Sequence, residues 1–175
     1  MVKYNEFEYW GNRKHPNTNT NDKLSDEEYV LIDKYSHGDI LEYGSGVGRC
    51  FTAYHDVNSL MCLDITNMYT ERAKEQAELL GLNMNHYVVS DNTYLPFDNQ
   101  MFDCSFAIKV LQHVVPSKIK EVLRELLRVS KLVVIYNNVF GDNLANHCFS
   151  HNYEGILEQI DAEIIENNKR YYVFK

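Results

Sequence analysis

The sequence lacks both an excess of basic residues and any long apolar run. Its 175 residues include 17 Lys and Arg against 25 Asp and Glu, so the formal net charge is −8 at pH 7. Binding a nucleic acid requires a basic face that neutralises phosphates, so this balance argues against such a partner. No segment approaches the roughly 18 consecutive apolar residues of a membrane span, and the first residues are polar and acidic, unlike a secretory signal. We therefore expect a cytoplasmic protein with no membrane partner.

Cysteine is also sparse, and the four residues of this type are scattered without a CxxC pair. In a chain of this size, that distribution predicts reduced, mostly buried thiols and no disulfide framework. His147, Cys148 and His151 lie close together in the sequence. A zinc site would need a further ligand and better-defined spacing, so the sequence predicts no metal site.

The chain does contain an alternation of apolar, strand-like segments and amphipathic, helix-like segments. Strands are predicted at 39–44, 59–65, 85–91, 101–110, 131–138, 162–167 and 169–175, and helices at 25–36, 48–57, 66–82, 117–130 and 152–160. Ser25 and Thr66 are the predicted N-caps of two helices, and Gly81 is the predicted end of the second. Such alternation indicates right-handed βαβ crossovers, and so an α/β fold with a mostly parallel sheet. The turn at Asn167 and Asn168 is too short for a crossover, so the last two strands are predicted to be antiparallel.

The segment ILEYGSGVGR, residues 40–49, places three glycines in five positions directly after an apolar strand. A dinucleotide-binding fingerprint has the spacing G-x-G-x-x-G, which would put the third glycine at position 49 when counted from Gly44. Position 49 is Arg49, and the third glycine is Gly48. Glu42, just before the glycines, would repel a pyrophosphate but could hold an ammonium group. The loop therefore favours a ligand with a cationic amine and no phosphate.

Four motifs in order resemble those of class I S-adenosylmethionine-dependent methyltransferases, from about residue 39 onward. They are ILEYGSGVGR, LMCLDIT, VVSDNTYLPFDNQMFD, and VLQHV followed by VLRELLRVSKLVVIY. The resemblance implies a Rossmann-like doubly wound sheet of seven strands, mostly parallel, with the last strand antiparallel. It implies transfer of a methyl group from S-adenosylmethionine to a small-molecule acceptor by in-line displacement, with S-adenosylhomocysteine as product. Residues 39–175 would form the core domain, and residues 1–38 an arm and helix covering the cofactor site.

The resemblance places the cofactor contacts at the ends of the first three strands. The implied residues are Glu42, Gly44, Ser45, Gly46, Gly48, Asp64, Ile65, Asp91 and Asn92. A carboxylate at Asp64 would accept hydrogen bonds from both ribose hydroxyls. Ile65 would offer an apolar face to adenine, Asp91 would accept from the adenine amino group, and Asn92 would supply a backbone donor. The alternative for Asp64 and Asp91 is a helix cap or a solvated loop carboxylate.

The acceptor is expected beyond the ends of the fourth and fifth strands. His113 is the predicted catalytic base, because histidine titrates near the working pH; a structural or cofactor-packing histidine is the alternative. Lys109 is assigned to the cofactor site, and it could also recognise an anionic acceptor or pair with a nearby carboxylate. The predicted substrate-binding residues are Tyr136, Asn138, His147 and His151.

The N-terminal arm adds Trp10 and Arg13 as predicted cofactor contacts, with Arg13 on the cofactor carboxylate; Trp10 could equally anchor the arm. No long insertion covers the acceptor site, which favours a small acceptor or a lid from a second subunit of a homodimer. Two other functions stay open: methylation of a protein or nucleic-acid group, and cofactor binding without catalysis. The acidic charge and the lack of an Asn/Asp-Pro-Pro-aromatic motif count against methylation of nucleobase amino groups.

Overall fold

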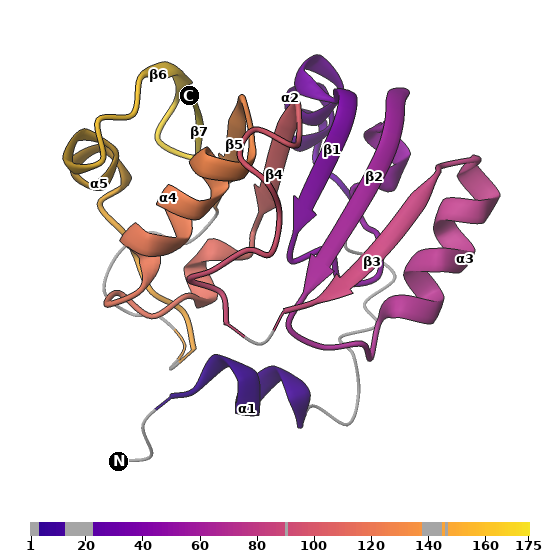
Figure 1. Ribbon diagram of the computed structural model, residues 1–175, viewed down its shortest axis with the longest axis horizontal. Helices are drawn as coiled ribbons and strands as arrows, with labels where there is room; N and C mark the ends of the chain where they lie inside the picture. Colours follow the sequence, from indigo (N-terminus) through magenta and orange to yellow (C-terminus); the bar gives the residue numbers. More distant parts are fainter. Residues whose placement is uncertain (1–3, 13–22, 90, 138–144, 146) are drawn as a thin grey trace.

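The computed structural model describes residues 4–12, 23–89, 91–137, 145 and 147–175. In these ranges one mixed sheet runs through the molecule (Figure 1). Its strands are β1 (His37–Tyr43), β2 (Asp56–Asp64), β3 (Met84–Val88), β4 (Cys104–Ile108), β5 (Val133–Tyr136), β6 (Ile164–Asn167) and β7 (Tyr171–Phe174). The strand order is β3-β2-β1-β4-β5-β7-β6, with β7 antiparallel to both of its neighbours and the other pairs parallel. The predicted Rossmann-like α/β fold, with an antiparallel last strand, is confirmed.

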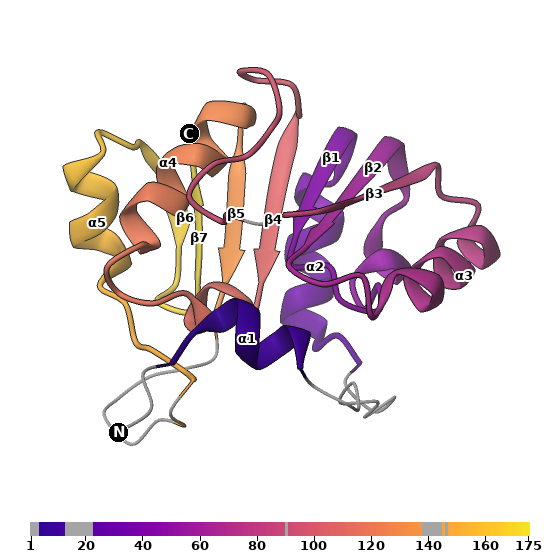
Figure 2. The ribbon, with the colours of Figure 1, turned by 60° about the horizontal axis from the view of Figure 1, so that its bottom comes forward.

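Helices cover both faces of the sheet. They are α1 (Glu6–Gly11), α2 (Asp26–Tyr35), α3 (Thr70–Leu80), α4 (Ile119–Val129) and α5 (Tyr153–Gln159), with the 3-10 turns η1 (Phe51–Ala53) and η2 (Leu111–His113). Helices α4 and α5 share one apolar core with the sheet, whereas α2, η1 and α3 share the other. Helix α1 lies across the end of the sheet to which the parallel strands point (Figures 1 and 2). That end is where ligands bind in open α/β sheets.

The apolar pattern of the sequence explains these layers. In α4, residues Ile119, Val122, Leu123 and Leu126 recur at helical spacing and are buried, so one stripe of the helix packs on the sheet. Every residue of β4 and β5 is buried, as expected for central strands covered on both faces.

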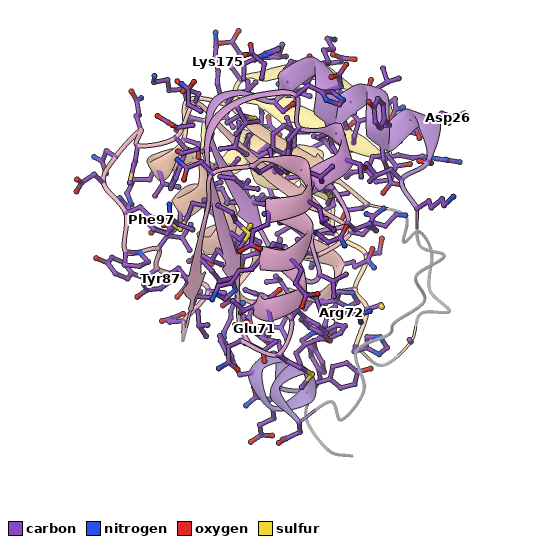
Figure 3. All side chains as sticks on the ribbon, turned by 90° about the vertical axis from the view of Figure 1, so that its right-hand side faces the viewer. Asp26, Glu71, Arg72, Tyr87, Phe97 and Lys175 are labelled. Atoms are coloured by element: carbon purple, nitrogen blue, oxygen red, sulfur yellow. The ribbon has the colours of Figure 1, made fainter. Side chains whose placement is uncertain are left out.

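The β3 edge of the sheet is more exposed. Its burial alternates along the strand, and Tyr87 packs edge-to-face on Phe97 with ring centroids 5.8 Å apart. Figure 3 faces this edge and shows the two rings together beside α3. The two aromatic rings thus shelter part of an edge that no further strand pairs with among the described residues.

Three local predictions are wrong. The predicted helix at 48–57 is only the single turn η1, and β2 already begins at Asp56. Gly48 is left-handed (φ +82°), and too few residues remain between the loop and β2 for a full helix. Thr66 does not cap α3; its hydroxyl accepts from the N–H of Met68, and the helix begins four residues later. Helix α1 lies in the N-terminal arm, where the sequence predicts no helix.

Asn5 explains the helix within the arm, because its side chain accepts from the N–H groups of Phe7 and Glu8 and so caps α1. The other two predicted boundaries are confirmed. Ser25 caps α2 in a capping box with Glu28, and Gly81 ends α3 in the left-handed conformation.

Throughout the described ranges, every helix is too short or too polar to cross a bilayer.

Candidate functional site

A cavity of about 410 Å³ opens at the carboxyl ends of β1, β2 and β4, and residues of α1 form part of its wall. It is lined by Glu6, Trp10, Tyr43, Gly44, Ser45, Gly46, Val47, Arg49, Leu63, Asp64, Ile65, Tyr69, Asn92, Ile108, Lys109, Val110, Gln112, His113 and Val114. Segments far apart in the sequence thus meet there, because parallel strands deliver their loops to one end of the sheet.

The glycine loop is fixed to the end of β2 by backbone hydrogen bonds. The carbonyl of Leu63 accepts from the N–H groups of Gly44 (2.7 Å) and Ser45 (3.2 Å). The N–H of Gly46 donates to the Asp64 carboxylate over 3.0 Å. Asp64 is buried, and burial raises the pKa of its carboxyl group although the N–H groups of Gly46 and Thr66 favour the ionised form. One carboxylate therefore shapes the loop and faces the cavity at the same time.

Glycine is needed at the three loop positions for different structural reasons. All three have positive φ, which side chains rarely tolerate. A Cβ on Gly44 would lie 2.3 Å from Val110, and one on Gly48 would lie 2.5 Å from the Phe51 ring. A side chain at either position would therefore clash with neighbouring side chains of the protein. A Cβ on Gly46 would meet no heavy atom within 4 Å. Gly46 is thus the position where the backbone lies open to a ligand.

Several polar side-chain atoms are buried in the cavity wall. Among the described residues, Ser45 Oγ, Asn92 Oδ1 and Gln112 Oε1 have no hydrogen-bond partner of standard geometry within the protein. Unsatisfied buried polar atoms are rare in folded proteins, since each costs about 1–3 kcal/mol. A ligand rich in hydroxyl and amino groups would satisfy them, so the cavity fits a nucleoside with an aminoacyl tail.

The family comparison agrees with this geometry. A profile described as "Methyltransferase domain" matches residues 40–132, which is more than half of the chain and spans β1 to the end of α4. The chain belongs to the class I S-adenosylmethionine-dependent methyltransferases. It is therefore an enzyme of this class, and S-adenosylmethionine is its methyl donor.

Solved structures show the same fold at low sequence identity. An S-adenosylmethionine-dependent methyltransferase from Leishmania major has a TM-score of 0.74 and 12% identity, covering 97% of this chain and 81% of that one. Another from Aquifex aeolicus has a TM-score of 0.64 and 18% identity, covering 98% and 97%. Phosphoethanolamine N-methyltransferase 1 from Haemonchus contortus, in complex with phosphoethanolamine and S-adenosylhomocysteine, has a TM-score of 0.61 and 14% identity, covering 83% and 34%.

In this methyltransferase, Glu42 lies beneath the glycine loop and is not part of the cavity wall. It is 3% exposed, and the hydroxyl of Tyr54 donates to its carboxylate over 3.2 Å. Burial raises the pKa of Glu42 to about 7, and hydrogen bonds from Cys50 and Tyr54 only partly offset that effect. The sequence did not indicate this burial, because it depends on η1 folding over the strand end.

Charged side chains form a network at one side of the cavity. Glu28 of α2 accepts from Arg49 (2.9 Å) and lies 3.1 Å from the Lys109 ammonium group. Burial alone would raise the pKa of Glu28, but hydrogen bonds from Arg49, Ser25 and Lys109 lower it to about 2. Lys109 has a left-handed backbone (φ +57°), a strained conformation of the kind that gathers at functional sites. Two cations, Arg49 and Lys109, therefore lie together in the cavity wall.

His113 also lines the cavity, next to Trp10 of α1. Its Nδ1 lies 2.9 Å from the carbonyl oxygen of His147. Since a carbonyl only accepts hydrogen bonds, Nδ1 carries the proton and Nε2 carries the lone pair in this arrangement. Trp10 of α1 packs edge-on against His113 with ring centroids 4.9 Å apart. Helix α1 thus contributes an aromatic wall next to this imidazole.

Several predicted site residues lie away from the cavity. Asp91 is exposed, and its carboxylate accepts from the N–H and hydroxyl of Thr93, so the strand-end aspartate forms a local turn. Tyr136 donates to Glu27 in the α2 layer, and His151 bonds the Leu111 carbonyl. Gly48 and His147 also lie outside the cavity lining. Arg13 and Asn138 fall outside the described residues.

Sequence reasoning also missed residues that line the cavity. Glu6 of α1 is 5% exposed, accepts from the Asn92 side chain (3.1 Å), and pairs with Lys118 (3.0 Å). Its one signal in the sequence is the Asn5 cap, which precedes a short acidic and aromatic segment. Tyr43 and Arg49 flank the glycines and Val110 follows Lys109, so neighbourhood to the motifs could have suggested them.

Proposed function

We propose that this methyltransferase acts on a small-molecule acceptor that approaches His113 beneath α1. The supporting observation is the size and lining of the cavity. At about 410 Å³, it lies near the lower end of single-ligand pockets, which span about 300–1,000 Å³. A cofactor of nucleoside size takes up most of that volume. The remaining space suits a small acceptor, and the net charge of −8 argues against a nucleic acid.

The cofactor would occupy the end of the cavity at the β1 and β2 loops, and the acceptor would occupy the end at His113. Asp64 would accept from the ribose hydroxyls, with Ile65 and Asn92 beside the adenine. The backbone from Gly44 to Gly46 would carry the aminoacyl part. Bound there, S-adenosylmethionine supplies an electrophilic methyl group.

Two cations support the placement of the cofactor tail. Arg49 and Lys109 line the cavity and both pair with Glu28. The carboxylate of the cofactor would lie on this side of the cavity, as a further partner for these cations. Glu42 would act from below the loop, by holding Tyr54 and η1 against the strand end. Residues 1–38 would cover the bound cofactor through Glu6 and Trp10.

His113 would remove the acceptor proton. Its Nδ1 donates to the His147 carbonyl, so Nε2 is the nitrogen that can accept a proton, provided the acceptor must lose one. The carbonyl of His147 would orient the His113 imidazole through this hydrogen bond. For the reaction itself, alignment of acceptor and methyl group is the main contribution of the protein, because in-line displacement needs no nucleophilic side chain.

A two-stage experiment tests the proposal. Calorimetry with S-adenosylhomocysteine establishes binding, and transfer of a labelled methyl group is then screened against small-molecule and macromolecular fractions. We expect His113→Ala to lower the turnover of the accepted small molecule by about 100-fold or more with little change in cofactor affinity. His55→Ala, at an exposed histidine on the α2 side, is the matched control. Label found only in protein or nucleic acid would refute the small-molecule acceptor.

A further inference from the structure

The side chains of His113, His147 and Cys148 converge beside the cavity, although they come from separate segments. His113 ends η2, and the other two residues precede α5. An imidazole nitrogen of each histidine and the Cys148 sulfur all lie within 4.8 Å of one another. In the described ranges, no other three side chains with metal-binding atoms gather this closely. His151 is not part of the cluster, since it bonds the Leu111 carbonyl.

The distances approach those of a tetrahedral zinc site. Zinc binds sulfur at about 2.3 Å and imidazole nitrogen at about 2.0–2.1 Å, which places tetrahedral S and N ligands about 3.5 Å apart. The sulfur of Cys148 lies 3.7 Å from Nδ1 of His113. The rings of His113 and His147 are nearly parallel, with centroids 5.4 Å apart. All three residues are only partly buried, so rotation of their side chains can close the remaining separation.

We propose that His113, His147 and Cys148 form a binding site for Zn²⁺. Two imidazoles and one thiolate are the nitrogen and sulfur ligands that this borderline cation prefers. Three protein ligands leave the fourth position to water or to a ligand atom, as in zinc sites that are not purely structural. On binding, the sulfur–zinc bond replaces the S–H bond of Cys148, and the proton passes to solvent.

The surroundings of the cluster support a built site. Tyr9 of α1 stacks on the His147 ring with centroids 4.7 Å apart, and Trp10 packs on His113. Both imidazoles therefore lie against aromatic rings of α1. If Nε2 of His113 binds the ion, its Nδ1–H keeps the hydrogen bond to the His147 carbonyl, an outer contact typical of metal-bound histidine. If Nδ1 binds the ion, the metal replaces that hydrogen bond.

If His113 is the base, as the proposed function holds, Zn²⁺ bound at this site should inhibit methyl transfer. A metal-bound imidazole no longer serves as a proton acceptor, so Zn²⁺ would occupy the group proposed as the base. Methyl transfer should therefore fall when Zn²⁺ is added and recover when a chelator removes it. Cys148→Ser should remain active at the same Zn²⁺ concentration.

Binding itself is tested without any methyl acceptor. The full chain, freed of any affinity tag and stripped with a chelator, is titrated with Co²⁺ as a spectroscopic substitute for Zn²⁺. We expect one equivalent to bind, with the thiolate-to-cobalt charge-transfer band and the intense visible bands of tetrahedral cobalt. Zn²⁺ should then displace the Co²⁺ and abolish both signals.

Variants assign the ligands. Cys148→Ser should abolish the charge-transfer band, and His113→Ala or His147→Ala should weaken binding about 100-fold. Cys104→Ala and His55→Ala, outside the cluster, should leave the titration unchanged, and circular dichroism checks that each variant is folded. Absence of stoichiometric binding, or a band that survives in folded Cys148→Ser, would overturn the zinc site. Neither outcome depends on methyl transfer, so the zinc site and the proposed function can fail separately.

Discussion

The backbone N–H of Gly46 donates to the Asp64 carboxylate over 3.0 Å, so the glycine loop and the end of β2 form one unit. The same carboxylate accepts from the Thr66 N–H (3.2 Å) and lines the cavity. Two segments that we propose bind the cofactor are therefore positioned by a single side chain. Cofactor affinity should depend on Asp64 both through direct contact and through the shape of the loop.

Replacing Asp64 by Asn should weaken S-adenosylhomocysteine binding about 10- to 100-fold. The amide keeps one oxygen for the Gly46 N–H but loses the charge and one acceptor, and hydrogen bonds to charged groups contribute about 1.5–3 kcal/mol. Isothermal titration calorimetry measures the change. Asp56→Asn, at the exposed start of β2, should bind like the wild type. Equal affinities of the two variants would contradict the assigned role of Asp64.

Alanine at Gly44 and at Gly46 should have opposite main effects. Both positions have positive φ, so both variants share the conformational strain. At Gly44 the new methyl group would also clash with Val110 at 2.3 Å, and the free energy of unfolding should fall by about 1–3 kcal/mol more than in Gly46→Ala. Gly46→Ala should instead lose cofactor affinity, because its methyl group would project into the part of the cavity where we propose that the cofactor binds. Urea denaturation and calorimetry on the two variants separate these effects, and identical behaviour would argue against them.

Glu42→Gln should change how stability depends on pH. The pKa of Glu42 is raised by burial from 4.5 to about 7 in the folded protein, so ionisation of the folded state is penalised. The contribution of the protonated group to stability is present below pH 4.5 and is lost as the pH rises through 7. Relative to Glu42→Gln, the wild type should therefore lose about 3 kcal/mol of unfolding free energy across this window. Parallel urea denaturation curves from pH 4 to 8 provide the measurement, and a constant difference would refute the buried, protonated Glu42.

Glu28→Gln should show the reverse pH dependence. Hydrogen bonds and charges of Arg49, Ser25 and Lys109 outweigh burial and lower the pKa of Glu28 from 4.5 to about 2. Its contribution to stability is therefore present above pH 4.5 and is lost as the pH falls toward 2. At pH 7 the variant should be destabilised by about 3 kcal/mol, because two cations lose their carboxylate.

The comparison of Glu28→Gln with the wild type is made by urea denaturation at several pH values. The difference in unfolding free energy should shrink below pH 4.5, where protonation of Glu28 begins to remove the same interaction from the wild type. Glu78→Gln, on the exposed side of α3, is the control and should track the wild type throughout. A difference that stays constant down to low pH would mean that Glu28 stabilises the fold by packing alone.

Local signals predicted much of the fold. The apolar runs of β4 and β5, the stripe of α4, the Ser25 cap and the Gly81 stop each depend on residues close in sequence. The glycine spacing and Glu42 favoured a ligand with a cationic amine and no phosphate, and the resemblance of four consecutive motifs to class I methyltransferases implied the methyl donor. The prediction of a helix at 48–57 was wrong because that segment is shaped by the packing of Gly48 against Phe51 and by the start of β2 at Asp56.

The sequence by itself therefore determined the sheet and its antiparallel end, and its motifs implied the methyl donor through their resemblance to one family. Tertiary structure alone decided which polar side chains face the cavity. It buried Glu42 beneath the loop, turned Asp91 toward Thr93, and brought Glu6 from the arm to Asn92. It also joined His113 to His147 and Cys148 across a gap of 34 residues. Such contacts arise from loops and helices meeting at one end of the sheet, and no periodicity along the chain encodes them.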